Sequence, residues 1–212
     1  MHLTHRLAAL ALASAATSVL IAGCGDDSPD AASPPTQTIN VDAAPAHVRW
    51  DSYQGIALPY GDDGPSATTG SGVVSGFTRT PQGAALAAIQ YSTRIGVAPD
   101  GQWSAVLGAG AAPGTARDTF AVNRMQVSIT APVVSSQAPK VLGYTITDYN
   151  DTRTALTIYS GFPDASVAAT DVVVVWSAGD WRVLLRSDTI EAPTRSVSAV
   201  PTEHFVTLGA PQ

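Results

Sequence analysis

The residues that could perform acid–base or metal chemistry are few and widely spaced. His47 and His204 are the only histidines after residue 23, and neither has a sequence neighbour that would complete a catalytic pair or a metal site. Asp148, Asp171 and Asp180 lie at or near the ends of predicted strands. An acid at a strand end is more often a turn or rim residue than a base with a raised pKa. We therefore predict surface histidines, rim acids and no catalytic, cofactor-binding or metal-binding residue.

Four aromatic residues are the candidates for a pocket or an interface. Tyr144, Tyr159, Trp176 and Trp181 fall in the predicted strands of the C-terminal half. Aromatic side chains at alternating strand positions pack more often in a core or as cross-strand pairs than around a ligand. Both interpretations stay open at this stage.

Cys24 carries the only chemistry that its position predicts strongly. It is the single cysteine, so a disulfide within one chain is impossible, and it follows Ile21-Ala22-Gly23 in a pattern that resembles the bacterial lipobox. A weakly basic start and an apolar run over Leu7–Ile21 precede it, as in a secretory signal peptide. We expect cleavage before Cys24 and acylation of its thiol, with the lipid chains holding the protein on the outer face of the cell membrane.

Composition divides the chain into three parts. We expect a lipoprotein signal peptide over residues 1–23, a flexible tether over residues 24–46 and a globular domain over residues 47–212. The tether is rich in Asp, Ser, Pro and Ala and has almost nothing to bury. The formal net charge of −6 becomes −7 after removal of residues 1–23, which contain one base, Arg6, and no acid. A chain this acidic has no electrostatic attraction to nucleic acid.

The stretch Gly76–Arg94 contains the best helix start in the sequence. Thr80 is placed to cap the free N–H groups of the first turn, and Pro81 occupies the first helical position, where its missing N–H is harmless. Small and apolar residues follow to Arg94, which predicts a helix with one broad apolar face that can lie close to a sheet. Gly83, near the start, suggests that another backbone crosses there.

Alternating residues predict two hairpins downstream of this helix. Val141–Tyr149 and Thr152–Tyr159 alternate apolar and polar residues on either side of the turn at Asn150-Asp151. Ala168–Trp176 includes Val172–Val175, a run typical of a strand buried on both faces, and it turns into Trp181–Arg186. We expect an α+β fold with one domain, in which the N-terminal helix packs in a curved antiparallel sheet.

The remaining segments give weaker patterns. They predict an edge strand or strap around Val48–Tyr60, followed at Asp62-Asp63 by a solvated turn or, less favoured, a calcium loop. Short helices are expected at Trp103–Leu107 and Arg117–Met125, with Phe120 and Met125 pointing inward, and a strand or connector at residues 127–136. The tail is expected to form a last strap that packs Phe205, Val206 and Leu208.

Two sets of residues resemble known families. Trp50, Gly55-x-x-Leu58-Pro59, Gly64-Pro65, the run Gly76–Ala84, Ala87-Ala88 and Arg94 resemble a domain of unknown function found in actinobacterial proteins, many of them encoded on integrative and conjugative elements. Members usually have His where this chain has Arg79. Gly143-Tyr144 and the Val172–Trp181 motif resemble the long paired strands of the nuclear transport factor 2-like superfamily, which implies a cone-shaped sheet around an N-terminal helix.

These observations favour binding or assembly over catalysis. The first hypothesis is an accessory envelope protein, for example of a conjugation or secretion apparatus, that contacts a protein partner through one sheet face. The second is a carrier of an apolar small molecule in the mouth of the cone. The third is a hydrolase or isomerase that uses one of the aspartates, since enzymes of the cone fold place such an acid in the pocket.

Overall fold

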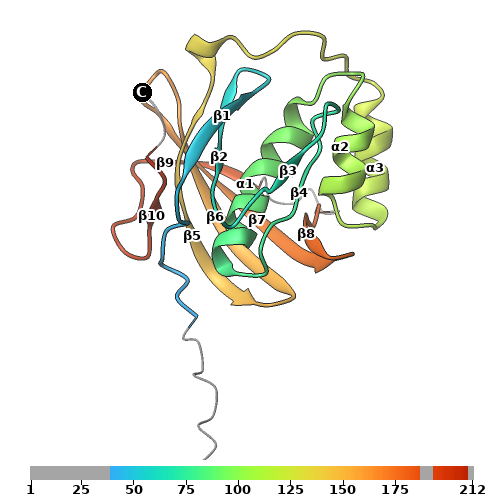
Figure 1. The fold of residues 1–212 in the computed structure, drawn as a ribbon. Coiled ribbons are helices and arrows are strands. Elements are labelled where there is room, and N and C mark those ends of the chain that lie inside the picture. Colours follow the sequence, from blue (N-terminus) through green and yellow to red (C-terminus); the bar gives the residue numbers. More distant parts are fainter. Residues whose placement is uncertain (1–38, 187–192, 210–212) are drawn as a thin grey trace, which may run out of the picture. The chain divides into compact units, whose positions relative to one another are not determined.

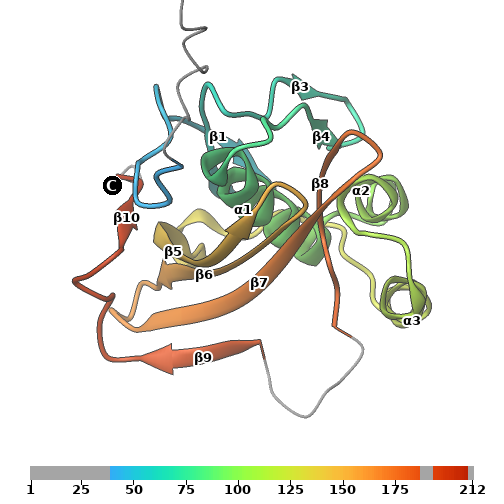
Figure 2. The same cartoon turned by 90° about the horizontal axis from the view of Figure 1, so that it is seen from below.

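The chain folds as an α+β domain in which one helix packs in a curved antiparallel sheet. The computed structural model describes residues 39–186 and 193–209. Within this part, helix α1 (Pro81–Val97) lies on the concave side of the sheet (Figures 1 and 2). The predicted fold class is confirmed, and the architecture is consistent with the nuclear transport factor 2-like cone. Cys24, the predicted signal peptide and residues 24–38 of the predicted tether lie outside the described residues.

Helix α1 begins where the capping pattern predicts. The Gly83 N–H donates to the Thr80 side-chain oxygen at 3.0 Å, and Pro81 is the first helical residue. A backbone does cross at Gly83, because a Cβ built there would lie 2.1 Å from the carbonyl oxygen of Thr78. The helix continues three residues past the predicted end at Arg94, and its last turn closes through the Ala98 N–H to the Arg94 carbonyl.

The expectation of a single apolar face on α1 is wrong, because the helix is covered on opposite sides. Eight consecutive residues, Ala84–Tyr91, are buried. The sheet covers one side, and the small hairpins at the N-terminal end of the domain cover the other (Figure 2). Gln90 is accommodated in this interior because its amide donates to the Pro59 carbonyl at 2.8 Å.

The main sheet has the strand order β10-β5-β6-β7-β8, with β9 paired to β7, and all its pairs are antiparallel. Its strands are β5 (Lys140–Asn150), β6 (Arg153–Gly161), β7 (Val167–Ser177), β8 (Asp180–Val183), β9 (Thr194–Val197) and β10 (Val206–Thr207). Both predicted hairpins are therefore present. The first turns after Asn150, whose side-chain oxygen accepts from the Thr152 and Arg153 backbone N–H groups.

One edge of β7 is shared between two strands. Residues 174–177 pair with β8, while residues 167–170 pair with β9, so the two partners occupy successive parts of the same edge. The prediction that Val172–Val175 is buried on both faces is wrong: Val172 and Val174 are buried, but Val173 and Val175 are half-exposed. The tail also contains β9, which the proline spacing did not predict.

The segment Val48–Tyr60 is a separate hairpin and not the single edge strand or strap predicted. Strands β1 (Arg49–Tyr53) and β2 (Ile56–Tyr60) pair with each other and lie over α1 (Figure 1). Gln54 and Gly55 form its turn with φ values of 50° and 83°, the left-handed conformation that tight hairpins require. A second small hairpin joins β3 (Ala67–Thr68) and β4 (Val74–Ser75).

The middle of the chain forms two short helices and a connector, as predicted. Helix α2 (Trp103–Gly110) continues through Gly108, and helix α3 (Thr115–Arg124) follows it. A 3-10 turn, η1 (Ser135–Gln137), lies in the connector to β5. Phe120 packs partly against the core, but the inward orientation predicted for Met125 is wrong, since this residue follows the end of α3 and is 68% exposed.

The domain includes residues before His47. The Gln82 amide donates to the carbonyls of Asn40 and Ala43, and Pro45 is buried. Residues 39–46, placed in the tether by their composition, therefore pack on the start of α1. At the other end, the predicted strap is present: Val206 and Leu208 are buried. Among the described residues, no helix is both long and apolar enough to span a membrane.

Candidate binding cleft

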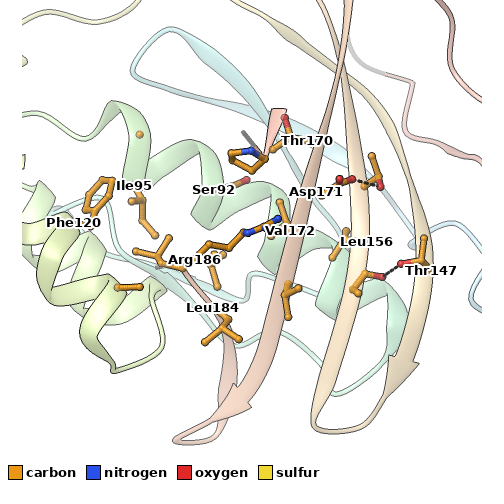
Figure 3. Close-up of a pocket in the computed structure, with 18 of the residues that line it drawn as sticks. Ser92, Ile95, Phe120, Thr147, Leu156, Thr170, Asp171, Val172, Leu184 and Arg186 are labelled. Atoms are coloured by element: carbon orange, nitrogen blue, oxygen red, sulfur yellow. Dashed lines mark hydrogen bonds between the residues drawn. The ribbon is translucent and has the colours of Figure 1, made fainter. Parts of the chain in front are cut away.

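A cleft of about 860 Å³ lies between the second half of α1, helix α3 and the central strands of the main sheet. Figure 3 shows Ser92 and Ile95 from α1, Phe120 from α3 and Leu156 from β6 among its lining side chains. The volume falls in the range of pockets that hold small organic ligands. Further lining residues come from β7, from the end of β8 and the segment after it, and from β9, among them Asp171, Val172, Leu184, Arg186 and Arg195.

Local contacts hold α3 in position to form one wall. The Ala112 N–H, between α2 and α3, donates to the Val183 carbonyl at 2.8 Å. At the far end of α3, the buried Arg124 donates to the Ala98 carbonyl and to the Asp100 carboxylate. The Ser128 hydroxyl also donates to Asp100 and is the main reason why the pKa of this acid lies below its ordinary value. These contacts tie both ends of α3 to neighbouring segments.

The walls are mainly aliphatic, and their polar side chains include a hydrogen-bonded cluster from β6, β7 and β9. The Thr157 hydroxyl donates to one carboxylate oxygen of Asp171 at 2.7 Å, and Arg195 donates to the other at 2.6 Å. The register explains this cluster: Thr157 is directly opposite Asp171, and Arg195 is opposite Ala169, so it lies on the diagonal. Asp171 lies between the part of β7 that pairs with β9, residues 167–170, and the part that pairs with β8, residues 174–177.

The three candidate aspartates have different environments. Asp171 is in the middle of β7 and not near a strand end as predicted, and it lines the cleft with 49% of its side chain exposed. Asp148 is exposed near the end of β5. Asp180 begins β8 and lies outside the cleft lining. Both oxygens of Asp171 accept hydrogen bonds from protein donors, so this carboxylate is held in a fixed orientation at the cleft wall.

Asp180 fastens the loop that precedes α1. Its carboxylate accepts from the backbone N–H groups of Gly76 at 2.8 Å, Phe77 at 3.2 Å and Trp181 at 2.9 Å. The Trp181 indole N–H also donates to the Thr78 carbonyl at 2.9 Å. We call this set of contacts the Asp180 clasp. It joins residues more than 100 positions apart, so sequence reasoning missed it.

The four candidate aromatic residues lie outside the cleft lining. Tyr144 and Trp181 are fully buried, and Tyr159 packs edge-on against Phe205 with ring centroids 5.6 Å apart. Trp176 packs edge-on against Trp181, and the Arg79 guanidinium lies 5.2 Å from the Trp176 ring centroid. The structure thus places these side chains in packing contacts. The cleft-lining residues that sequence reasoning missed, such as Phe120 and Leu184, give no local signal beyond being apolar.

The two histidines lie on the surface, as expected, but each has a carboxylate partner that sequence distance concealed. His47 Nδ1 is 2.7 Å from Asp62, and His204 Nδ1 is 2.8 Å from Asp42. These hydrogen bonds raise the pKa of both imidazoles above their ordinary value. Both pairs are exposed, so neither is enclosed in a cavity where it could act on a bound molecule.

Asp62 and Asp63 act as structural acceptors. Asp62 pairs with His47, and Asp63 accepts from the hydroxyls of Thr78 and Thr80 at the start of α1. Among residues 39–186 and 193–209, no group of three or more His, Cys, Asp or Glu side chains is placed to hold a metal ion. Gly61 and Gly64 exchange two backbone hydrogen bonds around Asp62 and Asp63, so this segment forms a turn.

Comparison with known proteins identifies a family for the chain but no individual curated protein or solved structure. A search of curated proteins found no match, and neither did a search of solved structures. A family model described as "Domain of unknown function (DUF8175)" matches residues 13–202. The predicted resemblance to a domain of unknown function is confirmed in that form. Since the model covers most of the sequence, the chain belongs to the DUF8175 family.

Proposed function

We propose that this protein is a lipoprotein that binds an apolar small molecule in the cleft beside α1. The single observation that carries this proposal is the cleft itself, with about 860 Å³ of space and mainly aliphatic walls. In this proposal Cys24 carries the lipid anchor, and the domain lies on the outer face of the cell membrane. The ligand packs against Ile95, Phe120 and Leu184 and excludes water from these side chains.

The charged cluster at the cleft wall is paired within the protein. Thr157 and Arg195 both donate to Asp171, so the aliphatic walls carry the recognition of an apolar ligand. Binding is favoured over hydrolysis or isomerisation because both Asp171 oxygens already accept hydrogen bonds.

A fluorescent probe with an apolar ring system and one sulfonate, anilinonaphthalene sulfonate, tests the cleft. We expect saturable binding to the wild type and roughly tenfold weaker binding to Leu184→Ser, since a lost apolar contact of this size is equivalent to about 1.4 kcal/mol. Phe162→Ser is the matched control, because Phe162 and Leu184 are both 39% exposed and Phe162 lies outside the cleft lining. Equal losses in the two variants would contradict the proposal.

The anchor is tested separately from the cleft. Cells expressing the full chain are labelled with an alkyne fatty acid, and the protein is examined for incorporated label. We expect label in the wild type and none in Cys24→Ala. Label that persists in the variant would overturn the anchoring proposal without affecting the binding proposal.

A second candidate is an accessory role in an envelope, conjugation or secretion complex. The resemblance to actinobacterial proteins of integrative and conjugative elements suggests this role, and exposed apolar side chains at the end of α3 favour it: Val122, Met125 and Val127. A photo-crosslinking residue at position 125, compared with one at the exposed Asp164, tests it in living cells. Adducts with an envelope protein from position 125 alone would support this role, and adducts from neither position would contradict it.

A further inference from the structure

Arg94 places a positive charge in the interior next to a second, smaller cavity. Its side chain is 2% exposed, and its guanidinium carbon lies 4.1 Å from the centroid of the Tyr53 ring. It donates to the Gln90 side-chain oxygen at 2.8 Å, the Gly72 carbonyl at 2.7 Å and the Tyr60 hydroxyl at 2.8 Å. These contacts fix the guanidinium at the junction of α1, β2 and the β3–β4 hairpin.

The charge of Arg94 has no counter-charge among the described residues. None of the ion pairs in this part of the chain includes Arg94, and its three acceptors are all uncharged groups. Burial lowers its pKa, and the neighbouring Tyr60 and Tyr53 oppose that effect. A buried charge without a partner is expensive, so the site favours an anion close to the guanidinium.

The guanidinium also keeps donor capacity for such an anion. An arginine has five N–H groups, and Arg94 uses one on Nε, one on Nη1 and one on Nη2. One N–H on each terminal nitrogen is therefore left over. A carboxylate is the anion whose two oxygens best match a pair of guanidinium N–H groups.

The cavity beside Arg94 has about 240 Å³ of space, and its lining is mainly polar. Ser52, Thr68, Thr69 and Gln102 are among its lining residues. No residue is shared between this lining and that of the larger cleft. It is thus a separate space that suits a small polar molecule and not an extended apolar one.

Asp51 adds an acid to the same lining. It is exposed on β1, and one of its oxygens accepts from the Ser52 N–H at 2.8 Å. A cavity lined by the buried Arg94 and by Asp51 on an exposed strand is complementary to a molecule that carries both charges. A doubly charged anion such as phosphate would instead be repelled by Asp51.

We propose that this cavity binds a small zwitterion of the amino-acid class, with its carboxylate on Arg94 and its ammonium group on Asp51. The ligand carboxylate supplies a counter-charge for Arg94, and its ammonium group supplies one for Asp51. Tyr53 and Gln102 hold the walls in place, since the Tyr53 hydroxyl donates to the Gln102 oxygen at 3.2 Å. This site is independent of the proposed function of the larger cleft.

Glycine and acetate are the probes for this proposal. The Nε–H resonance of Arg94 in the full domain is followed by NMR while glycine, sodium acetate or sodium chloride is added at matched ionic strength. We expect saturable shifts with glycine and weaker binding of acetate, by roughly threefold to fivefold, the strength of a single exposed ion pair. Chloride should give no saturable shift.

Two variants separate ligand binding from a purely structural role of Arg94. Asp51→Asn leaves Arg94 in place and should reduce glycine affinity to that of acetate, while Asp164→Asn, at an exposed acid outside the cavity lining, should change neither. Glycine and acetate should each raise the thermal unfolding midpoint of the wild type. Arg94→Gln should abolish both of these increases. Absence of glycine binding to the wild type, acetate binding as tight as glycine binding, or the same response to chloride would each overturn the proposal.

Discussion

His204 and Asp42 join two segments that are 162 positions apart in the chain. The hydrogen bond to Asp42 raises the pKa of His204 above 6.5, its ordinary value. A raised pKa means that the pair stabilises the fold below pH 6.5 and that this contribution is lost as the pH rises through the folded-state pKa. Asp42→Asn should therefore lower the pKa of His204 toward its ordinary value, as measured by NMR titration of the ring.

The second histidine provides the control for that titration. His47 is paired with Asp62 in a different place, so its pKa should not change in Asp42→Asn. The stability difference between wild type and variant should also shrink as the pH is raised from 5.5 to 8. A His204 titration that is the same in both proteins would contradict the role given to Asp42.

The Asp180 clasp predicts a large effect from a residue that the sequence marks only as an acid near a turn. Asp180→Ala removes the acceptor of three backbone N–H groups, and we expect roughly 2–3 kcal/mol of lost unfolding free energy, the usual result when donors lose a charged acceptor. Urea denaturation measures the change. Asp148→Ala is the comparison, because Asp148 is an exposed strand acid that should change stability by no more than about 0.5 kcal/mol.

Two glycines of α1 should respond in opposite directions to the same substitution. Gly83→Ala should destabilise the domain by roughly 1–3 kcal/mol, because the new Cβ would meet the Thr78 carbonyl oxygen at 2.1 Å. Gly96→Ala should stabilise it by up to about 1 kcal/mol, since a Cβ built there meets no described atom within 4 Å beyond the adjoining helix backbone, and alanine favours the helix. Thermal and urea unfolding of both variants test this contrast.

If both alanine variants were stabilising, the close crossing of the Thr78 backbone over the first turn would be wrong. If both were destabilising, the helix would be packed at Gly96 as well as at Gly83. The opposite signs are thus a specific signature of the way in which the loop before α1 folds back over its start.

Elements could be predicted from the sequence where their cause is local. The start of α1 follows from Thr80 and Pro81, and the β5–β6 turn follows from Asn150, because in each case the acceptor and donors lie within a few residues. The burial of both sides of α1 could not be predicted, since it depends on a hairpin that arrives from residues 49–60. Nor could the exposure of Met125, which depends on where α3 ends.

The candidate cleft was beyond prediction for a related reason. Asp171, Thr157 and Arg195 meet only because β7 pairs with β6 on one edge and with β9 on the other. Nothing in the neighbouring sequence of any of the three marks this meeting. Arg94 could be named as part of a family pattern, but its burial with three uncharged acceptors depends on the packing of α1 against two hairpins.

At the scale of the whole molecule, the N-terminal boundary of the domain decides what can be removed without loss of stability. A chain that begins at residue 39 keeps Pro45 buried and keeps the Gln82 hydrogen bonds to Asn40 and Ala43. Its urea denaturation midpoint should match that of a chain that begins at residue 25. A chain that begins at His47 loses the two Gln82 hydrogen bonds, the bond from the Asp62 N–H to the Ala46 carbonyl, the Asp42–His204 pair and the buried proline.

We expect this shorter chain to lose roughly 2–4 kcal/mol of unfolding free energy, since each hydrogen bond contributes about 1 kcal/mol and a buried side chain a similar amount or more. Gln82→Ala in the chain from residue 39 should reproduce part of that loss, because it breaks both bonds to the N-terminal segment. Equal stability of the chains from residues 39 and 47 would mean that residues 39–46 do not stabilise the domain and belong to the tether. A loss of stability only in the chain from His47 would show that residues 39–46, which composition assigns to the tether, are part of the folded domain.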